Sequence, residues 1–77
     1  MIHKRYFIFR ACILNGGNEY CGQTSNWNPS FDTAKLWTEY GSAKKRALEL
    51  KKKLPSGWGI YVGAALVGVP NTVAVML

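Results

Sequence analysis

Residues 54–77 carry no charged side chain, and this feature constrains the fold more than any other. They follow directly after Lys51, Lys52 and Lys53, the flank expected of a membrane span with its basic end inside. Scattered glycines and the sequence Pro70-Asn71-Thr72 break the stretch into two pieces of strand length. We therefore predict a buried β-hairpin, with strands over residues 59–67 and 69–77. A membrane helix is the alternative.

A second hairpin is predicted near the N-terminus, where residues 6–14 alternate between two strand faces. We expect the odd face to meet the core and the even face to be partly solvated. The odd face carries Phe7, Phe9, Ala11 and Ile13. Asn15-Gly16-Gly17-Asn18 reads as the turn, because Gly and Asn tolerate positive φ. With Gly16-Gly17 at its centre, Ile13 lies opposite Tyr20 and Cys12 opposite Cys21. With Asn15-Gly16 at its centre, Cys12 faces Glu19. We prefer the first register.

The preferred register bears on the redox state of the two cysteines. Directly opposed Cβ atoms are about 4.5–5.5 Å apart, which would strain a disulfide. The N-terminus has basic residues and an apolar run, but Arg10 interrupts that run and no cleavage site of small residues follows. We therefore expect a cytoplasmic protein with two free thiols. No metal site is expected, since His3 is the sole histidine.

Residues 38–54 are predicted to form a helix. Thr38 is the expected N-cap and Glu39 suits the first turn. Gly41 costs about 1 kcal/mol relative to Ala, so regular helix is expected from Ser42. A narrow apolar stripe repeats at helical spacing: Leu36, Tyr40, Ala43, Ala47, Leu50 and Leu54. The chain is therefore predicted to be one α+β domain over residues 1–77, with a helix on an antiparallel sheet of about four strands in the order β-β-α-β-β.

The opposite face of this helix is strongly basic. The chain has ten Lys and Arg residues against four acids, a formal charge of +6. A basic surface favours polyanionic partners, although a solvated helix face is the alternative. Glu49 is expected to pair with Lys53. Leu48, an apolar residue within the basic arc, resembles the centre of a contact patch. The basic candidates for partner binding are Lys44, Lys45, Arg46, Lys51, Lys52 and Lys53.

Three tryptophans have different expected roles. Trp37 precedes the helix and is expected to close the core, and Trp58 to cover its far end. Trp27 lies between two asparagines in a stretch without periodicity. It either packs under its loop or serves as an exposed anchor for a partner. We include it among the candidate partner-binding residues.

No pattern of residues supports catalysis. Only one histidine is present, the four acids are scattered, and no glycine motif for phosphate or nucleophile follows a strand. We expect no enzyme activity, no catalytic residue and no cofactor.

One part of the chain resembles a known class of proteins. Trp27, then Asp32-Thr33-Ala34-Lys35-Leu36-Trp37-Thr38, then residues 43–54 form an order that resembles small phage and prophage accessory proteins, anti-CRISPR inhibitors among them. The resemblance implies a phage-encoded inhibitor that binds a host or defence component in the bacterial cytoplasm. It carries over no functional residue.

Two functions are therefore expected as alternatives. The first is a non-enzymatic module that binds and blocks a protein or ribonucleoprotein complex, such as CRISPR machinery. The second is direct nucleic-acid binding through the helix face of residues 44–53. Homodimerisation through a sheet edge or an uncovered sheet face is a further hypothesis.

Overall fold

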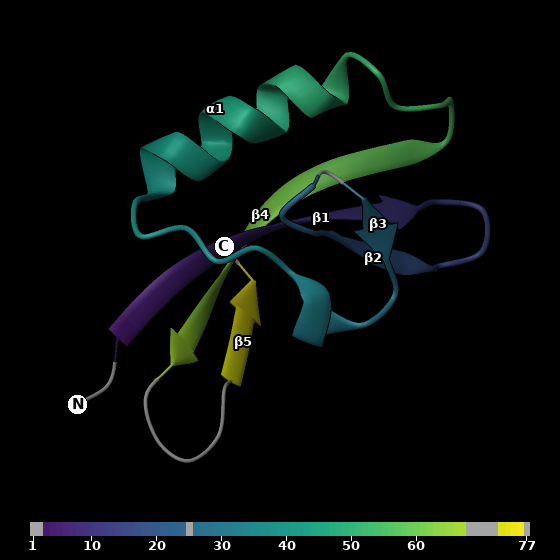
Figure 1. Ribbon diagram of the computed structural model, residues 1–77. Coiled ribbons are helices and arrows are strands. Elements are labelled where there is room, and N and C mark those ends of the chain that lie inside the picture. The colour runs from purple at the N-terminus through teal and green to yellow at the C-terminus, as the bar shows by residue number, and fades with distance from the viewer. Residues whose placement is uncertain (1–2, 25, 68–72, 77) are drawn as a thin grey trace.

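One helix lies across a five-stranded antiparallel sheet (Figure 1). The computed structural model describes residues 3–24, 26–67 and 73–76. The strands lie in the order β3-β2-β1-β4-β5. Their bounds are β1 His3–Cys12, β2 Asn18–Cys21, β3 Trp27–Asn28, β4 Trp58–Val67 and β5 Val73–Met76. The helix α1 spans Tyr40–Lys51, and a short 3-10 helix η1 spans Phe31–Thr33.

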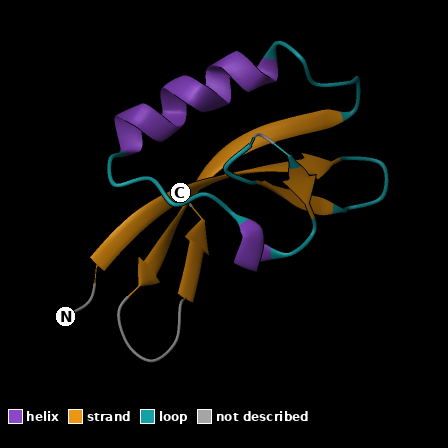
Figure 2. Cartoon of the chain, in the orientation of Figure 1, coloured by secondary structure: helices purple, strands orange, loops and turns teal. Residues whose placement is uncertain are grey.

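The predicted α+β architecture is confirmed (Figure 2). The two-residue strand β3 was not expected. The uncharged C-terminal stretch forms the strands β4 and β5, which pair antiparallel between residues 63–66 and 73–76. The predicted turn at Pro70-Asn71-Thr72 lies outside the described residues. Within the described part of the chain, no helix has the length and apolarity needed to cross a membrane.

The predicted register of the first hairpin is wrong. Phe9 lies opposite Tyr20 and Arg10 opposite Glu19, so neither proposed two-residue turn occurs. Strand β1 ends at Cys12, and residues 13–17 form a wider loop. Its left-handed residue is Gly16, at φ 69°. The Gly17 N–H donates to Oδ1 of Asn15 at 2.8 Å, and the Cys12 N–H donates to the Gly17 carbonyl at 2.9 Å.

This register separates the two cysteines. Cys12 lies opposite Trp58 on β4, and Cys21 lies opposite Trp27 on β3. Both are free thiols, as expected, and the register does not place them opposite each other as the predicted one did. The loop also leaves Ile13 and Leu14 at 78% and 87% exposure, so the prediction that Ile13 faces the core is wrong.

Both faces of the sheet are covered, which corrects the expectation of a partly solvated even face. Ile8 on the even face is fully buried beneath α1, with Ala43, Ala47 and Leu50 of the helix. The small alanines let the helix approach the sheet closely. The odd face holds an aromatic cluster that η1 covers: Phe7, Phe9, Tyr20 and Phe31, with Phe31 edge-on to Phe7 at 4.9 Å.

The helix is shorter than predicted at its C-terminal end and begins differently. Glu39, not Thr38, is the N-cap, and it makes no side-chain capping bond. Gly41 lies inside the helix rather than before it. The central stripe residues are buried, whereas Leu36 and Tyr40 at its N-terminal end are exposed. The helix ends at Lys51, so Lys52 and Lys53 belong to the connection to β4.

Candidate interaction site

The basic surface is formed by α1 and the two residues after it. Lys44, Lys45 and Lys51 are exposed on the helix, and Lys52 and Lys53 are exposed beyond it. These five lysines form no ion pair with any described residue. The predicted Glu49–Lys53 pair is absent because Lys53 lies past the end of the helix. Glu49 instead lies 3.7 Å from Nη1 of Arg46, one turn earlier.

Arg46 differs from its lysine neighbours. It is half-buried and points to the β2 side of the helix, close enough to Cys21 to act on its thiol. Burial raises the pKa of the Cys21 thiol above its usual value, and the nearby charges of Arg46 and Lys35 partly oppose this rise. The neutral thiol is thus the favoured form, which makes Cys21 a core residue rather than a nucleophile.

Leu48 lies at the rim of a groove, and not in the middle of a solvated face. The groove has a volume of about 250 Å³ and runs between α1 and β4. Its helix side is formed by Tyr40, Lys44, Ala47, Leu48 and Lys51, and its strand side by Ile60, Tyr61 and Val62. Leu48 is 54% exposed. The helical pattern indicated only basic side chains around Leu48. The structure instead has a largely apolar groove next to Leu48, with Lys44 and Lys51 in its lining.

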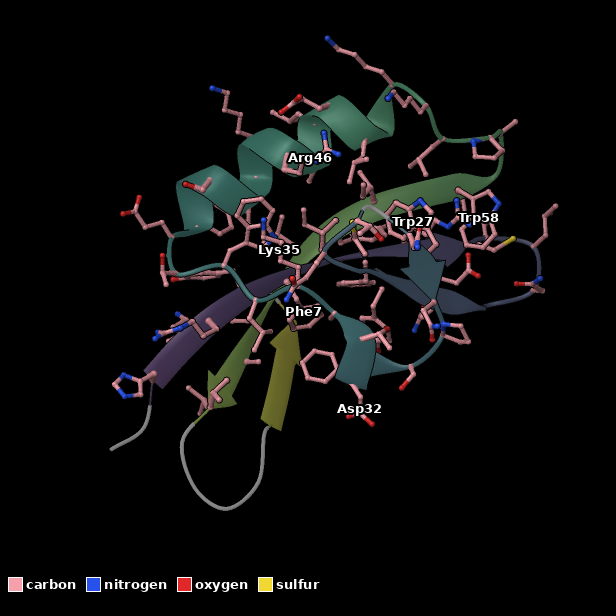
Figure 3. The ribbon with its side chains drawn as sticks, in the orientation of Figure 1. Phe7, Trp27, Asp32, Lys35, Arg46 and Trp58 are labelled. Atoms are coloured by element: carbon pink, nitrogen blue, oxygen red, sulfur yellow. The ribbon has the colours of Figure 1, made fainter. Side chains whose placement is uncertain are left out.

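Trp27 belongs to the sheet rather than to an unstructured loop. As part of β3 it pairs with Cys21, and its half-buried ring packs against the core beneath α1. The Arg10 guanidinium lies 4.6 Å from the Trp27 ring and 4.4 Å from the Trp58 ring. The two tryptophans lie near one another on this side of the sheet (Figure 3). Arg10 is thus held between two aromatic rings.

An ion pair completes this cluster. Nε and Nη2 of Arg10 donate to Oε1 of Glu19 at 2.8 and 2.5 Å. The two side chains are 18% and 29% exposed, so the pair is partly shielded from water. Lys is a poor substitute for an Arg whose guanidinium stacks on aromatic rings and binds a carboxylate. The sequence did not indicate this pair because neither expected register placed Arg10 opposite Glu19.

The structure does not join the candidate residues into one surface. Trp27 lies on the edge strand β3, and the groove beside Leu48 lies over β4, with β2 and β1 between them. At about 4.8 Å per strand, this separation is about 14 Å. Among the candidates, Trp27 therefore lies apart from the lysines of the basic face, although its contact Arg10 lies opposite Ile60 of the groove.

Trp37 closes the core as expected. Its ring packs against the helix-side core, and its backbone forms a two-way bridge with Tyr6, at 2.8 Å and 2.7 Å. Nζ of Lys35 lies 4.0 Å from the centroid of the Trp37 ring. A cation over an exposed ring contributes about 0.5–1 kcal/mol. These contacts explain why the segment before α1 stays against the sheet.

Among the described residues, no group of His, Cys, Asp and Glu side chains could hold a metal ion. A second, polar hollow borders the loop after β2, lined by Gly22, Gln23, Thr24, Asn26, Asn28, Asp32, Thr33 and Ala34. Asp32 is the one ionisable group in that lining.

Comparisons with known proteins give no match: no family model fits the chain, and no curated protein or solved structure resembles it significantly.

Proposed function

We propose that this protein is a non-enzymatic binding module that engages an acidic surface of a partner protein or ribonucleoprotein and blocks it. The class of partner follows from the resemblance to phage accessory proteins, and CRISPR machinery of a bacterial host is the first candidate. The observation that supports the proposal is the unneutralised charge of Lys44, Lys45, Lys51, Lys52 and Lys53 on one side of the molecule.

The distribution of charge makes this surface suited to association. Unpaired lysines on a rigid helix steer an oppositely charged partner and raise its association rate at low salt. Leu48 and Tyr40 add exposed apolar surface beside the lysines. Charge with an adjacent apolar contact is the combination from which a specific protein interface is built, because rim charges alone contribute little affinity.

Affinity capture from a bacterial host lysate, followed by mass spectrometry, tests the proposal. The wild-type chain should recover a specific partner, and a variant with Lys44→Glu, Lys45→Glu, Lys51→Glu and Lys52→Glu should lose it. A control carries Lys4→Glu, which lies on β1 outside the basic face. Recovery of the same partner by the helix variant, or of no partner by the wild type, contradicts the proposal.

Direct nucleic-acid binding is the second candidate, and the contiguity of the exposed lysines favours it. Removing one lysine that neutralises a phosphate reduces the slope of log K against log salt by about 0.7–0.9. Replacement of Lys44, Lys45 and Lys52 by Ala should thus make the slope shallower by about 2–3. The measurement is titration of labelled single-stranded and duplex oligonucleotides at several salt concentrations. No binding at low salt eliminates this candidate.

A further inference from the structure

Two apolar side chains protrude from the loop that follows β1. Ile13 and Leu14 are 78% and 87% exposed, more than any other large apolar side chain among the described residues. A single exposed leucine is common on protein surfaces, but two adjacent apolar residues at a loop tip are unusual, because turns favour small and polar residues. Contiguous apolar surface that is exposed marks a site of contact with a protein or a membrane.

Backbone hydrogen bonds hold this loop tip in place. The Ile13 N–H donates to the Gly57 carbonyl at 2.8 Å, which joins the loop to the connection between α1 and β4. The Gly16 N–H donates to the Cys12 carbonyl at 2.9 Å and closes the loop. The exposed side chains therefore belong to an ordered loop, and binding through them costs little further ordering of the backbone.

The neighbouring segment at the same end of the molecule is basic. The loop after β1 and the connection between α1 and β4 lie side by side at this end (Figure 1). Lys52 and Lys53 begin that connection, are exposed, and form no ion pair with any described residue. Lys53 precedes Gly57 by four residues, so their Cα atoms are at most about 14 Å apart. This end of the molecule therefore presents an apolar tip with cations beside it.

The positions outside the described ranges connect to other parts of the fold. Residues 1–2 and 68–72 adjoin the start of β1 and the end of β4, about 30 Å along the strands from this loop. Residue 25 follows β2 at the end away from the loop. Residue 77 follows β5, whose last residue lies opposite Gly63, about 17 Å from the loop end of β4. The apolar tip is therefore available to a partner.

The composition of this end favours a lipid surface over other partners. Protein interfaces are enriched in Arg and depleted in Lys, whereas lysine clusters are typical of segments that bind anionic lipids. Neither hollow described above includes Ile13 or Leu14, so the tip is a protrusion that needs a yielding apolar phase to enter. A nucleic acid offers phosphates to the lysines but no apolar phase to the tip.

We propose that this end of the protein binds the surface of a membrane that contains anionic phospholipids. Ile13 and Leu14 enter the boundary between headgroups and acyl chains, and Lys52 and Lys53 contact the lipid phosphates. The long lysine side chains keep their ammonium groups at the level of the headgroups. Buried apolar area and attraction to anionic lipid add together in such binding. This inference goes beyond the proposed function, because it places the binding module at a membrane surface.

Co-sedimentation with vesicles tests the proposal. The chain should bind vesicles of phosphatidylcholine with about one-third phosphatidylglycerol at least about tenfold more tightly than vesicles of phosphatidylcholine alone. Leu14→Ser should weaken binding to the anionic vesicles about tenfold. Leu48→Ser, the same change at another exposed leucine, should weaken it less than about twofold, and circular dichroism checks that both variants fold. No binding to either vesicle, equal binding to both, or equal effects of the two serine variants overturns the proposal.

Paired charge variants test the position of the cations. Lys52→Glu with Lys53→Glu should weaken vesicle binding at least about tenfold. Lys44→Glu with Lys45→Glu should weaken it less than about threefold, because these lysines lie about 10 Å further along the helix axis, beyond the Debye length of about 8 Å. Equal loss in both variants indicates adsorption of the whole basic face and overturns insertion of the tip. If Leu14→Ser abolishes capture of a soluble protein from lysate but leaves vesicle binding unchanged, the tip is a protein contact and this inference fails.

Discussion

At the scale of single residues, Arg10 combines contacts with two aromatic rings and an ion pair. It stacks on Trp27 and Trp58 and binds Glu19 through two nitrogen atoms. We expect Arg10→Lys to destabilise the fold by about 1–3 kcal/mol, because an ammonium group cannot keep both the planar stacking and the paired donation. Urea unfolding followed by tryptophan fluorescence measures the loss. Arg5→Lys is the control, since Arg5 lies on the same strand without these contacts. An equal change in both variants would contradict the structural role of Arg10.

At the scale of elements, the pairing of β1 with β4 depends on Gly63. Phe7 lies opposite Gly63, and a Cβ at that position would overlap the Phe7 ring, which is itself fully buried. Gly63→Ala should therefore destabilise the protein by about 1–3 kcal/mol through overpacking. The corresponding fall in Tm, about 4–8 °C for each kcal/mol, is measurable by calorimetry. An unchanged Tm would show that the aromatic cluster can move aside.

The helix allows the opposite test with the same substitution. Gly41 lies within α1, is exposed, and has no atom within 4 Å of a Cβ built on it. Gly41→Ala should stabilise the protein by about 0.5–1 kcal/mol, because Ala has the higher helix propensity. Thermal unfolding followed by circular dichroism measures the gain. A loss of stability would mean that the first turn of α1 is not helical in solution.

At the scale of the whole molecule, the net positive charge lowers the free energy of unfolding. A charge of +6 on so small a chain causes self-repulsion in the folded state, and added salt screens it. We expect Tm to rise by about 2–8 °C between 10 mM and 300 mM NaCl, equivalent to roughly 0.5–1 kcal/mol. A fall in Tm with salt would instead indicate that attractive pairs such as Arg10–Glu19 dominate. Sodium chloride and potassium chloride should act alike if screening is the cause.

Local patterns in the sequence determined which elements form. Alternation was enough to identify β1 as a strand, since the strand period is a property of the backbone. Glycines and the sequence Pro70-Asn71-Thr72 divided the uncharged stretch into the two pieces that contain β4 and β5. The apolar stripe of Ala43, Ala47 and Leu50 identified the buried side of α1 for the same reason. The helix residues opposite this stripe, most of them Lys and Arg, identified the basic outer surface. These features depend on neighbours along the chain, and the chain alone therefore specifies them.

Tertiary contacts decided how the elements meet. Residues 13–17 close a wider loop than their turn residues indicated, because this register pairs Phe9 with Tyr20 and Arg10 with Glu19. Contacts between distant segments likewise place Arg10 between two tryptophans and Leu48 at the groove between α1 and β4. Register and edge exposure are properties of packing between strands and helix, and a residue's immediate neighbours in sequence do not specify them.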